Sequence, residues 1–398
     1  MIIEPKVRGF ICTTAHPKGC EKNVENQIQY VLSHKKNLQK GPQNVLVIGA
    51  STGYGLASRI VSAFGYQAST IGVSFERPSE NERTATAGWY NTAGFEKFAL
   101  EKGLYTKSLN GDAFSDEIKQ KTIELIQKDL KKIDLVIYSL ASPKRTHPVT
   151  KQTYNSVLKP LRGTYTEKTV NPLNGEIRTV TIEPANEIDI QNTIQVMGGE
   201  DWEMWIDALK KANVLAEGVK TVAYSYIGPK LTYPIYWEGT IGKAKDHLEG
   251  MAKILNEKLK SLHGCATVSV NKAVVTQSSA AIPVVPLYIS LLFKVMKEKN
   301  IHEDCIEQIQ RLFEDILYVK NSDQKQIPVL VRVDDWEMRP DVQSAVADLW
   351  NKIDSQNIYE ISDLKGYKED FYRLFGFGLK GLNYSEESHL GVEIPSIS

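Results

Sequence analysis

Apolar runs of strand length alternate with segments of helical periodicity from residue 44 to residue 141. Runs rich in β-branched residues predict strands over residues 44–51, 68–76, 104–113 and 133–141. Apolar residues at helical spacing predict the helices between them, over residues 54–64, 94–103 and 115–132. Each helix must return the chain to the start of a neighbouring strand, so the alternation predicts a parallel sheet covered on both faces.

The alternation is interrupted at residues 142–195, which are rich in Thr, Pro, Asn, Lys and Glu and predict an insertion that carries a hairpin. The alternating pattern then resumes. Helices are expected over residues 201–212 and 243–262, and strands over residues 220–228 and 265–275. The interruption therefore lies inside one continuous sheet and does not separate two sheets.

Beyond Ala280 the pattern is mostly helical to the end of the chain, and no flexible linker marks a domain boundary. Ser115, followed by acidic residues, is expected to cap the helix that begins after it. We expect one elaborated domain over residues 1–398, with a core over 40–280 that contains the insertion, substrate-pocket helices over 281–320 and a C-terminal helical extension over 321–398.

Charge and composition exclude several classes of protein. Acidic and basic residues balance at 48 each, so no nucleic-acid partner is expected.

The longest apolar stretch, from Ala280 to Met296, contains two prolines, a serine and a lysine and is too short to span a membrane. Four cysteines form no CxxC pair, which favours free thiols in a reducing, cytoplasmic compartment. Histidines such as His16 and His147 lack partners at ligand spacing, so no metal site is expected.

Three glycines lie where the first predicted strand meets the first predicted helix. In "VIGASTGYG" these are Gly49, Gly53 and Gly55. Glycine permits a tight turn there and lets the N–H groups of the helix N-terminus approach a pyrophosphate. The G-x-x-x-G-x-G spacing is typical of short-chain dehydrogenases. It predicts an α/β, doubly wound Rossmann fold of an elaborated short-chain dehydrogenase type, with a core that binds a nicotinamide dinucleotide.

The second predicted strand ends in "VSFERP", which places a carboxylate at the edge of the sheet. A carboxylate in this position usually accepts hydrogen bonds from the adenosine ribose, and its charge repels the extra phosphate of NADP. Glu76 therefore favours NAD, although Arg77 beside it could partly offset the repulsion of that phosphate.

Two further predicted strands end at the same edge, where ligands bind in doubly wound folds. Asp112 and Ala113 in "NGDAF" could hold the adenine. Ser139, Leu140 and Ala141 in "YSLAS" could line the ribose and the nicotinamide. Their shared position at strand ends makes them candidate cofactor residues.

Reductases of this class often use a tyrosine and a lysine near one substrate oxygen, and three pairings are available. Tyr226 and Lys230 have Y-x-x-x-K spacing, but the intervening Gly-Pro does not continue a helix. Tyr236 and Lys243 could share a helix face, since seven residues make nearly two turns. Tyr236 and Lys245 converge only if Tyr236 precedes a helix that starts near Gly239 and Thr240. Spacing alone leaves Lys243 and Lys245 both open.

Many segments resemble one known family along nearly the whole chain, from residue 1 to about residue 385. They include "VRGFICTTAHPKGC", "GASTGYGLASRI", "GWYN", "GDAFSDEIK", "YSLASP", "VMGGEDW", "YSYIGP", "GTIGKAK", "VSVNKAVVTQ" and "PLYISLLFKVMKEKNIHEDCIEQI". The sequence resembles the bacterial NADH-dependent trans-2-enoyl-ACP and trans-2-enoyl-CoA reductases of the FabV class. The Y-x8-K signature of that family selects Tyr236 and Lys245.

The resemblance also implies the ligands and their contacts. It implies Tyr236 and Lys245 as the catalytic pair, with Tyr226 touching the substrate. It implies NADH bound at Lys245 and at Gly49, Ala50, Ser51, Thr52, Gly53, Tyr54, Phe75, Glu76, Asp112, Ala113, Leu140, Ala141, Val274, Val275 and Thr276. It further implies an enoyl thioester of acyl carrier protein or CoA as the substrate, and a monomeric enzyme.

The implied reaction is the last reductive step of fatty acid elongation, in which hydride adds to the β-carbon of the enoyl thioester and an enolate forms. A donor aimed at the enolate oxygen is worth roughly 3–4 kcal/mol. Making a tyrosine a base at pH 7 would cost about 4 kcal/mol, so Tyr236 is expected to act as a neutral donor. Lys245 is expected to hold the nicotinamide ribose or the phosphates and to lower the pKa of the phenol.

Two other functions remain consistent with a dinucleotide-binding fold. A ketoacyl or alcohol reductase of the short-chain class would need a working pair at Tyr226 and Lys230. A protein that binds NAD as a sensor, without turnover, would not need Tyr236 and Lys245.

Overall fold

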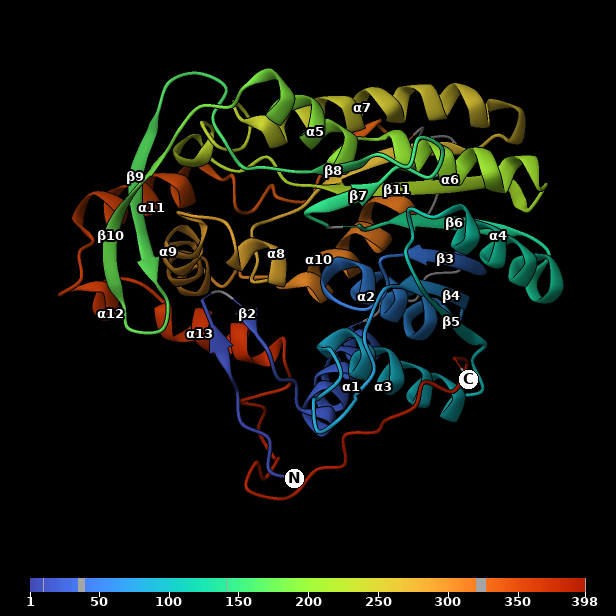
Figure 1. Cartoon of the computed structure of the whole chain (residues 1–398), viewed down its shortest axis with the longest axis horizontal. Helices are drawn as coiled ribbons and strands as arrows, with labels where there is room; N and C mark the ends of the chain where they lie inside the picture. Colours follow the sequence, from blue (N-terminus) through green and yellow to red (C-terminus); the bar gives the residue numbers. More distant parts are fainter. Residues whose placement is uncertain (10, 35–39, 141, 320–326, 398) are drawn as a thin grey trace.

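The computed structural model describes residues 1–9, 11–34, 40–140, 142–319 and 327–397. A seven-stranded sheet with the order β13-β12-β11-β6-β3-β4-β5 forms its centre (Figure 1). Each neighbouring pair of these strands is parallel. The strand order reverses between β3 and β6, and this crevice at the carboxyl ends of the strands is where a doubly wound fold binds its ligand.

The strands of this sheet are β3 (Asn44–Ile48), β4 (Ser69–Ser74), β5 (Thr106–Asn110), β6 (Ile133–Tyr138), β11 (Leu215–Ser225), β12 (Cys265–Val270) and β13 (Leu330–Arg332). Antiparallel pairs form outside it, from β1 (Val7–Arg8) with β2 (Ile11–Cys12), β7 (Lys144–Thr146) with β8 (Thr153–Asn155), and β9 (Tyr165–Asn171) with β10 (Glu176–Ile182). The α/β, doubly wound fold predicted from the sequence is confirmed.

The α-helices that surround the sheet fall into three groups. Those of the first half are α1 (Pro17–His34), α2 (Gly53–Ile60), α3 (Ala87–Glu101), α4 (Asp116–Leu125), α5 (Glu187–Met197) and α6 (Glu200–Lys211). The long α7 (Thr240–Leu259) follows β11. The C-terminal group comprises α8 (Gln277–Ala280), α9 (Val285–Glu298), α10 (Cys305–Leu312), α11 (Pro340–Lys352), α12 (Ile358–Ile361) and α13 (Leu364–Arg373).

Alternation along each strand sends side chains into two separate cores. In β3, Val45 and Val47 pack with α1, α2, α3 and α10 on one face. Leu46 and Ile48 pack with α4, α6 and α7 on the other face. Because both faces are covered, the strands are apolar throughout and do not show the alternation of a half-exposed sheet.

A third core lies beyond the carboxyl edge of the sheet and joins segments that are distant in sequence. It contains Tyr236, the buried face of α9, and apolar residues of α11, α12 and α13. The β9–β10 hairpin of the insertion stands beside these helices at one end of the molecule (Figure 1). The insertion and the C-terminal region therefore build one structure over the ligand edge.

Most sequence-based elements match the structure, although α1 (Pro17–His34) was not predicted and α3 begins at Ala87, before the expected helix over 94–103. Three further differences concern helix ends, the insertion and the C-terminal region. Ser115 caps α4 as expected, since its hydroxyl accepts from the N–H of Ile118. The helices expected over 54–64 and 115–132 each end in a single π-helical turn, Val61–Gly65 and Ile126–Leu130. The insertion region also contains α5, which its polar composition concealed.

The third difference is a correction. The C-terminal extension was expected to be helical, and α11, α12 and α13 confirm helices there. It also supplies β13, which pairs with β12 at the edge of the core sheet. A three-residue strand has too short a pattern to be distinguished from a loop by periodicity.

No helix among the described residues combines the length and the apolar character that a bilayer crossing needs.

Gly55 and Gly250 provide a matched test of the packing of α2 on the sheet. A Cβ on Gly55 would lie 1.8 Å from the carbonyl oxygen of Gly49, so Gly55→Ala should force α2 away from β3 and lower the Tm sharply. A Cβ on Gly250, within α7, would meet nothing within 4 Å. Gly250→Ala should therefore raise the free energy of unfolding by about 0.5–1 kcal/mol. Thermal and urea unfolding of both variants measure this, and an unchanged Tm in Gly55→Ala would contradict the packing.

Candidate active site

The glycine turn between β3 and α2 has the shape that a pyrophosphate site requires. Gly49 and Gly53 adopt φ angles of 88° and 54°, which strain other residues. A Cβ on Gly53 would meet only the Cγ2 of Thr276, at 3.8 Å, so the turn is open on the side of the helix N-terminus. Ala50, Ser51, Thr52 and Tyr54, the other predicted cofactor residues of this turn, complete it. The open turn and the exposed N–H groups fit an anionic diphosphate.

The carboxylate of Glu76 is held at the edge beside this turn. Its Oε1 accepts a hydrogen bond of 2.6 Å from the hydroxyl of Ser51. Its backbone exchanges hydrogen bonds of 2.7 and 2.8 Å with the side chain of Asn110. A Cβ on Gly88 would lie 2.1 Å from Oε1, so the carboxylate fits only because residue 88 is glycine. The remaining acceptor positions of Glu76 fit ribose hydroxyls. Phe75 before it is 76 % exposed, as expected of a residue that covers a ligand.

The ends of β5 and β6 place the other expected adenine and ribose residues at the same edge. Asp112 accepts from the N–H of Phe114 at 3.0 Å, which fixes its loop. The carbonyl of Ala113 accepts from the indole of Trp205 at 3.1 Å. Leu140 packs against the core formed by β4 and β6. Ala141 lies outside the described residues.

Val274, Val275 and Thr276 lie between β12 and α8 and meet the glycine turn across a cavity. The cavity has a volume of about 340 Å³, and these three residues line it together with Thr52 and Gly53. The hydroxyl of Thr276 caps α8 by accepting from the N–H of Ser279 at 3.0 Å. Predicted cofactor residues that are more than 200 positions apart in the sequence therefore face one cavity.

Tyr226 and Tyr236 face each other beyond the end of β11. Their rings lie 5.0 Å apart at 83°, an edge-to-face contact. Tyr236 is 6 % exposed and lies in the turn before α7, with Gly239 at the N-cap position of that helix. No hydrogen bond joins its hydroxyl to another described residue, so its proton is available to a ligand.

Lys245 and Lys243 occupy different environments, although both lie in the first turns of α7. The Nζ of Lys245 points toward the end of β11, 3.5 Å from the carbonyl oxygen of Tyr224. Burial lowers the pKa of Lys245 to about 8, an effect that Glu249 partly opposes. Lys243 is 49 % exposed and pairs with Asp246 at 3.1 Å. It lines a separate surface cavity of about 540 Å³ together with Trp237 and Glu238.

Tyr226 and Lys230 do not form a helical pair. Gly228 adopts a φ of 78°, and Lys230 begins a 3-10 turn that runs to Thr232. The hydroxyl of Tyr226 donates instead to Glu337 at 3.1 Å. The geometry that a ketoacyl reductase of the short-chain class would need is therefore absent at these residues.

Burial raises the pKa of Tyr236, and the charge of Glu337 raises it further. The phenol is therefore neutral at physiological pH. A lowering of this pKa by Lys245, expected from the sequence, is not among the effects that act on Tyr236. Glu337 had no sequence signal, because it lies 111 residues from Tyr226 in a region without a motif.

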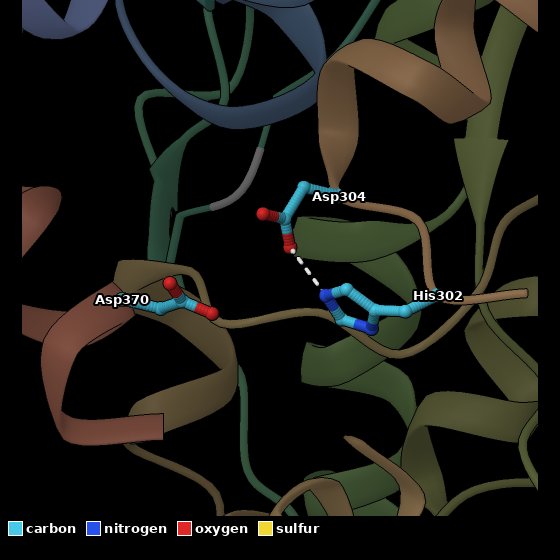
Figure 2. A group of neighbouring side chains, drawn as sticks. All are labelled: His302, Asp304 and Asp370. Carbon is cyan, nitrogen blue, oxygen red and sulfur yellow. Dashed lines mark ion pairs between the residues drawn. The ribbon is translucent and has the colours of Figure 1, made fainter. Parts of the chain in front are cut away.

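Three further polar residues converge between α10 and α13. His302 and Asp304 precede and begin α10, and Asp370 projects from α13 toward them (Figure 2). Potential ligand atoms of the three lie within 4.8 Å of one another. Asp370 has a cation of its own, because Arg373 lies 3.0 Å from it. His302 lies 3.5 Å from Asp304, and burial lowers the pKa of its imidazole. The absence of a metal site stays a prediction.

A doubly wound sheet, an open glycine turn and a carboxylate at the end of the second strand define a dinucleotide-dependent oxidoreductase. Residues 83–318 match a family model described as the trans-2-enoyl-CoA reductase catalytic region. Residues 2–81 match the NAD(P)H binding domain of trans-2-enoyl-CoA reductase, and residues 327–387 match the enoyl reductase FAD binding domain. The chain belongs to the trans-2-enoyl-CoA reductase family.

Relatives and a solved structure resemble the chain over its full length. An enoyl-acyl-carrier-protein reductase (NADH) of Coxiella burnetii is 60% identical over 400 residues, covering 100% of this chain and 98% of that protein. A trans-2-enoyl-CoA reductase (NADH) of Ruminiclostridium cellulolyticum is 58% identical, covering 100% of both chains. The crystal structure of Treponema denticola trans-2-enoyl-CoA reductase in complex with NAD is 50% identical, with a TM-score of 0.95 over 99% of this chain and 100% of that one.

The region matched to an FAD binding domain does not fit a flavin dinucleotide. The connection from β13 to α11 contains no glycine, so no open turn exists there for a pyrophosphate. It carries Asp334 and Asp335, which already pair with Arg332 and Arg311, so these arginines are not free for a phosphate. The apolar face of α11 is buried in the third core. We assign no FAD site to these residues.

Asp370 should make stability depend on pH. Burial, then the charge of Asp304, raises the pKa of Asp370 to about 7, while Arg373, Lys297 and Asp363 act more weakly. Asp304, by contrast, has its pKa lowered to about 2, because His302 overcomes the effect of burial. Asp370 is harder to ionise in the folded protein than in the unfolded chain, where its pKa is about 4. Its contribution to the free energy of unfolding is therefore lost as the pH rises from about 4 to about 7.

Asp370→Asn should therefore stabilise the protein at pH 8, on the order of 2 kcal/mol, and have little effect at pH 4. Asp341→Asn is the matched control. Arg339, then Lys299, lowers the pKa of Asp341, so its effect on Tm should be equal at pH 5 and pH 8. Melting curves across this range test both, and a Tm gain for Asp370→Asn that did not grow with pH would contradict the assignment.

Proposed function

We propose that this protein reduces the trans-2 double bond of enoyl thioesters of acyl carrier protein or CoA with NADH, giving the saturated acyl thioester. This is the last reductive step of fatty acid elongation. The observation that carries the proposal is the buried Tyr236, whose ring contacts Tyr226 and whose hydroxyl makes no hydrogen bond to another residue that the structure describes. The names and NAD complexes of full-length relatives support the same reaction.

NADH would lie along the carboxyl edge of the sheet. The glycine turn from Gly49 to Tyr54 would hold the pyrophosphate, Glu76 the adenosine ribose, and Asp112 and Ala113 the adenine. Leu140, Val274, Val275 and Thr276 would complete the nicotinamide end. When bound, the cofactor supplies the hydride that adds to the β-carbon of the enoyl group.

Tyr236 would stabilise the enolate oxygen of the thioester and deliver a proton. Its raised pKa keeps the phenol protonated, which suits a donor and excludes a base at neutral pH. A single well-placed donor to a developing oxyanion stabilises the transition state by roughly 3–4 kcal/mol. Tyr226 would contact the substrate beside it.

Lys245 would hold the nicotinamide ribose or the phosphates. Its amine lies beside the end of β11 and, among the described residues, makes only one long hydrogen bond, to the Tyr224 carbonyl. A bound anion would stabilise the charged form of this amine, whose pKa burial lowers to about 8. Lys243, paired on the surface, would have no part in the reaction.

The helices over residues 281–320 would enclose the acyl chain. In α9 the apolar residues Leu287, Ile289 and Leu291 are buried, and they share the third core with Tyr236.

The four cysteines are free thiols, which supports a reducing compartment such as the cytoplasm. We further propose that the enzyme acts as a monomer, which sedimentation of the purified chain would test.

Variants of the catalytic residues test the reaction directly. The wild type should oxidise NADH with crotonyl-CoA or dodecenoyl-CoA. Tyr236→Phe and Lys245→Ala should each lower kcat by about 100-fold or more, because each removes a group that acts in the transition state. Lys243→Ala should leave turnover unchanged. No turnover by the wild type with either substrate would remove the proposed function, and loss of activity in Lys243→Ala would overturn the assignment of the lysines.

Cofactor choice should depend on Glu76. Removing the carboxylate in Glu76→Ala would remove its repulsion of the additional phosphate of NADPH, so the preference for NADH should fall by about tenfold or more. Glu80→Ala is a control on the same segment, outside the glycine turn. Steady-state kinetics with NADH and NADPH measure the ratio, and an unchanged ratio in Glu76→Ala would contradict this role.

A further inference from the structure

Glu337 is a fully buried carboxyl group that joins three distant segments. It lies between β13 and α11 and is 0 % exposed. Its Oε1 accepts from the hydroxyl of Tyr226 at 3.1 Å and from the hydroxyl of Tyr288 at 2.7 Å. Its Oε2 accepts from the N–H of Ala273 at 2.7 Å. One side chain thus connects the end of β11, the loop after β12 and α9.

The amide of Gln343 sets the direction of the hydrogen bond between Tyr288 and Glu337. The Nε2 of Gln343 donates to the backbone carbonyl of Glu337 at 2.7 Å, which fixes the orientation of the amide. The same Nε2 donates to the oxygen of Tyr288 at 3.1 Å. Because Tyr288 accepts from Gln343, its single proton goes to Glu337. Tyr226, Tyr288 and the N–H of Ala273 thus all donate to the Glu337 carboxyl, which favours its ionised form against the burial that raises its pKa.

Charged groups around Glu337 have opposing effects on its ionisation. Burial raises its pKa, while Tyr288, the ammonium of Lys272 and the N–H of Ala273 lower it, and Asp334 raises it slightly. Lys272 is buried too, with its Nζ donating to the carbonyl of Ala273 at 2.8 Å. Burial likewise lowers the pKa of Lys272. The three hydrogen bonds donated to Glu337, together with the nearby Lys272, are therefore what supports a negative charge at this position.

This network limits what Tyr226 can do. A phenol has one proton, and Tyr226 donates it to Glu337, so its oxygen presents only lone pairs to the site. Tyr236, in ring contact with Tyr226, has its proton uncommitted among the described residues. Of the two tyrosines, only Tyr236 is therefore free to donate to a substrate oxygen.

We propose that Glu337 is a positioning residue of the reductase, which fixes Tyr226 as a hydrogen-bond acceptor and leaves Tyr236 as the sole proton donor of the pair. This inference rests on the proposed function. Through Ala273, the same carboxylate also holds the start of the loop that carries Val274, Val275 and Thr276. In this assignment Glu337, which is fully buried, acts on the reaction through Tyr226 and is not itself a substrate or cofactor contact.

Glu337→Gln tests this with little change in shape. The amide must use its oxygen for the N–H of Ala273, so its NH2 group faces both phenol oxygens and their protons turn away. The proton of Tyr226 then points into the site and competes with Tyr236 for the substrate oxygen. We expect kcat with crotonyl-CoA to fall by about tenfold or more, while the Kd for NADH, measured by fluorescence titration, changes by less than about twofold.

A double-mutant cycle separates positioning from general destabilisation. If Glu337 acts through Tyr226, Glu337→Gln should lower kcat strongly in the wild type but by less than about threefold in the Tyr226→Phe background. A parallel cycle with Tyr288→Phe should show weaker coupling to kcat. Asp334→Asn is the matched control, because Asp334 is a buried carboxylate of the same loop, paired with Arg332, that contacts neither tyrosine.

Each outcome is decisive. A normal kcat in Glu337→Gln, an equal loss with and without the Tyr226 hydroxyl, or an equal loss in Asp334→Asn would overturn the positioning role. An inactive wild type would instead remove the proposed function. If Glu337→Gln melts below the assay temperature, Glu337→Asp, which keeps the charge but shortens its reach, replaces it in the same cycle. Coupling of that variant to Tyr226 supports the proposal, and additivity overturns it.

Discussion

The parallel pairing of β11 between β6 and β12 is the constraint on which the site depends. Parallel strands bring all their carboxyl ends to one edge, so the residues that follow each strand become neighbours. Tyr226 follows the end of β11, and the Tyr224 carbonyl that contacts Lys245 lies near the end of that strand. The loop from Ala273 to Thr276 follows β12. Loss of this pairing would separate Tyr226 and Lys245 from the loop that carries Val274, Val275 and Thr276.

The buried polar groups near this edge have a common design. Glu337, Lys272 and Tyr288 lie in the interior, where an unpaired charge or donor would be costly. Their hydrogen bonds are directional, so they fix the orientation of the phenols as well as their position. The C-terminal region thereby contributes to the site by supporting the tyrosines.

The environments of Lys243 and Lys245 show why spacing alone could not choose between them. Both residues lie on α7, two positions apart, and each lies at a plausible distance in sequence from Tyr236. The turn before α7, which begins only at Thr240, decides that Tyr236 is outside the helix. One lysine then points to the strand ends, and the other points to solvent beside Asp246.

The sequence by itself determined six strands of the sheet, the helices that connect them, the glycine turn, the Ser115 cap and the carboxylate at Glu76. Each of these depends on local periodicity or on backbone freedom within a few residues. Only the tertiary structure decided that β13 joins the sheet, that α5 forms within the insertion and that Glu337 orients Tyr226. These features depend on contacts between segments distant in sequence, such as the 62 residues between Val268 and Leu330 and the 111 residues between Tyr226 and Glu337. No local pattern encodes such a contact, since it arises from the packing of the whole chain.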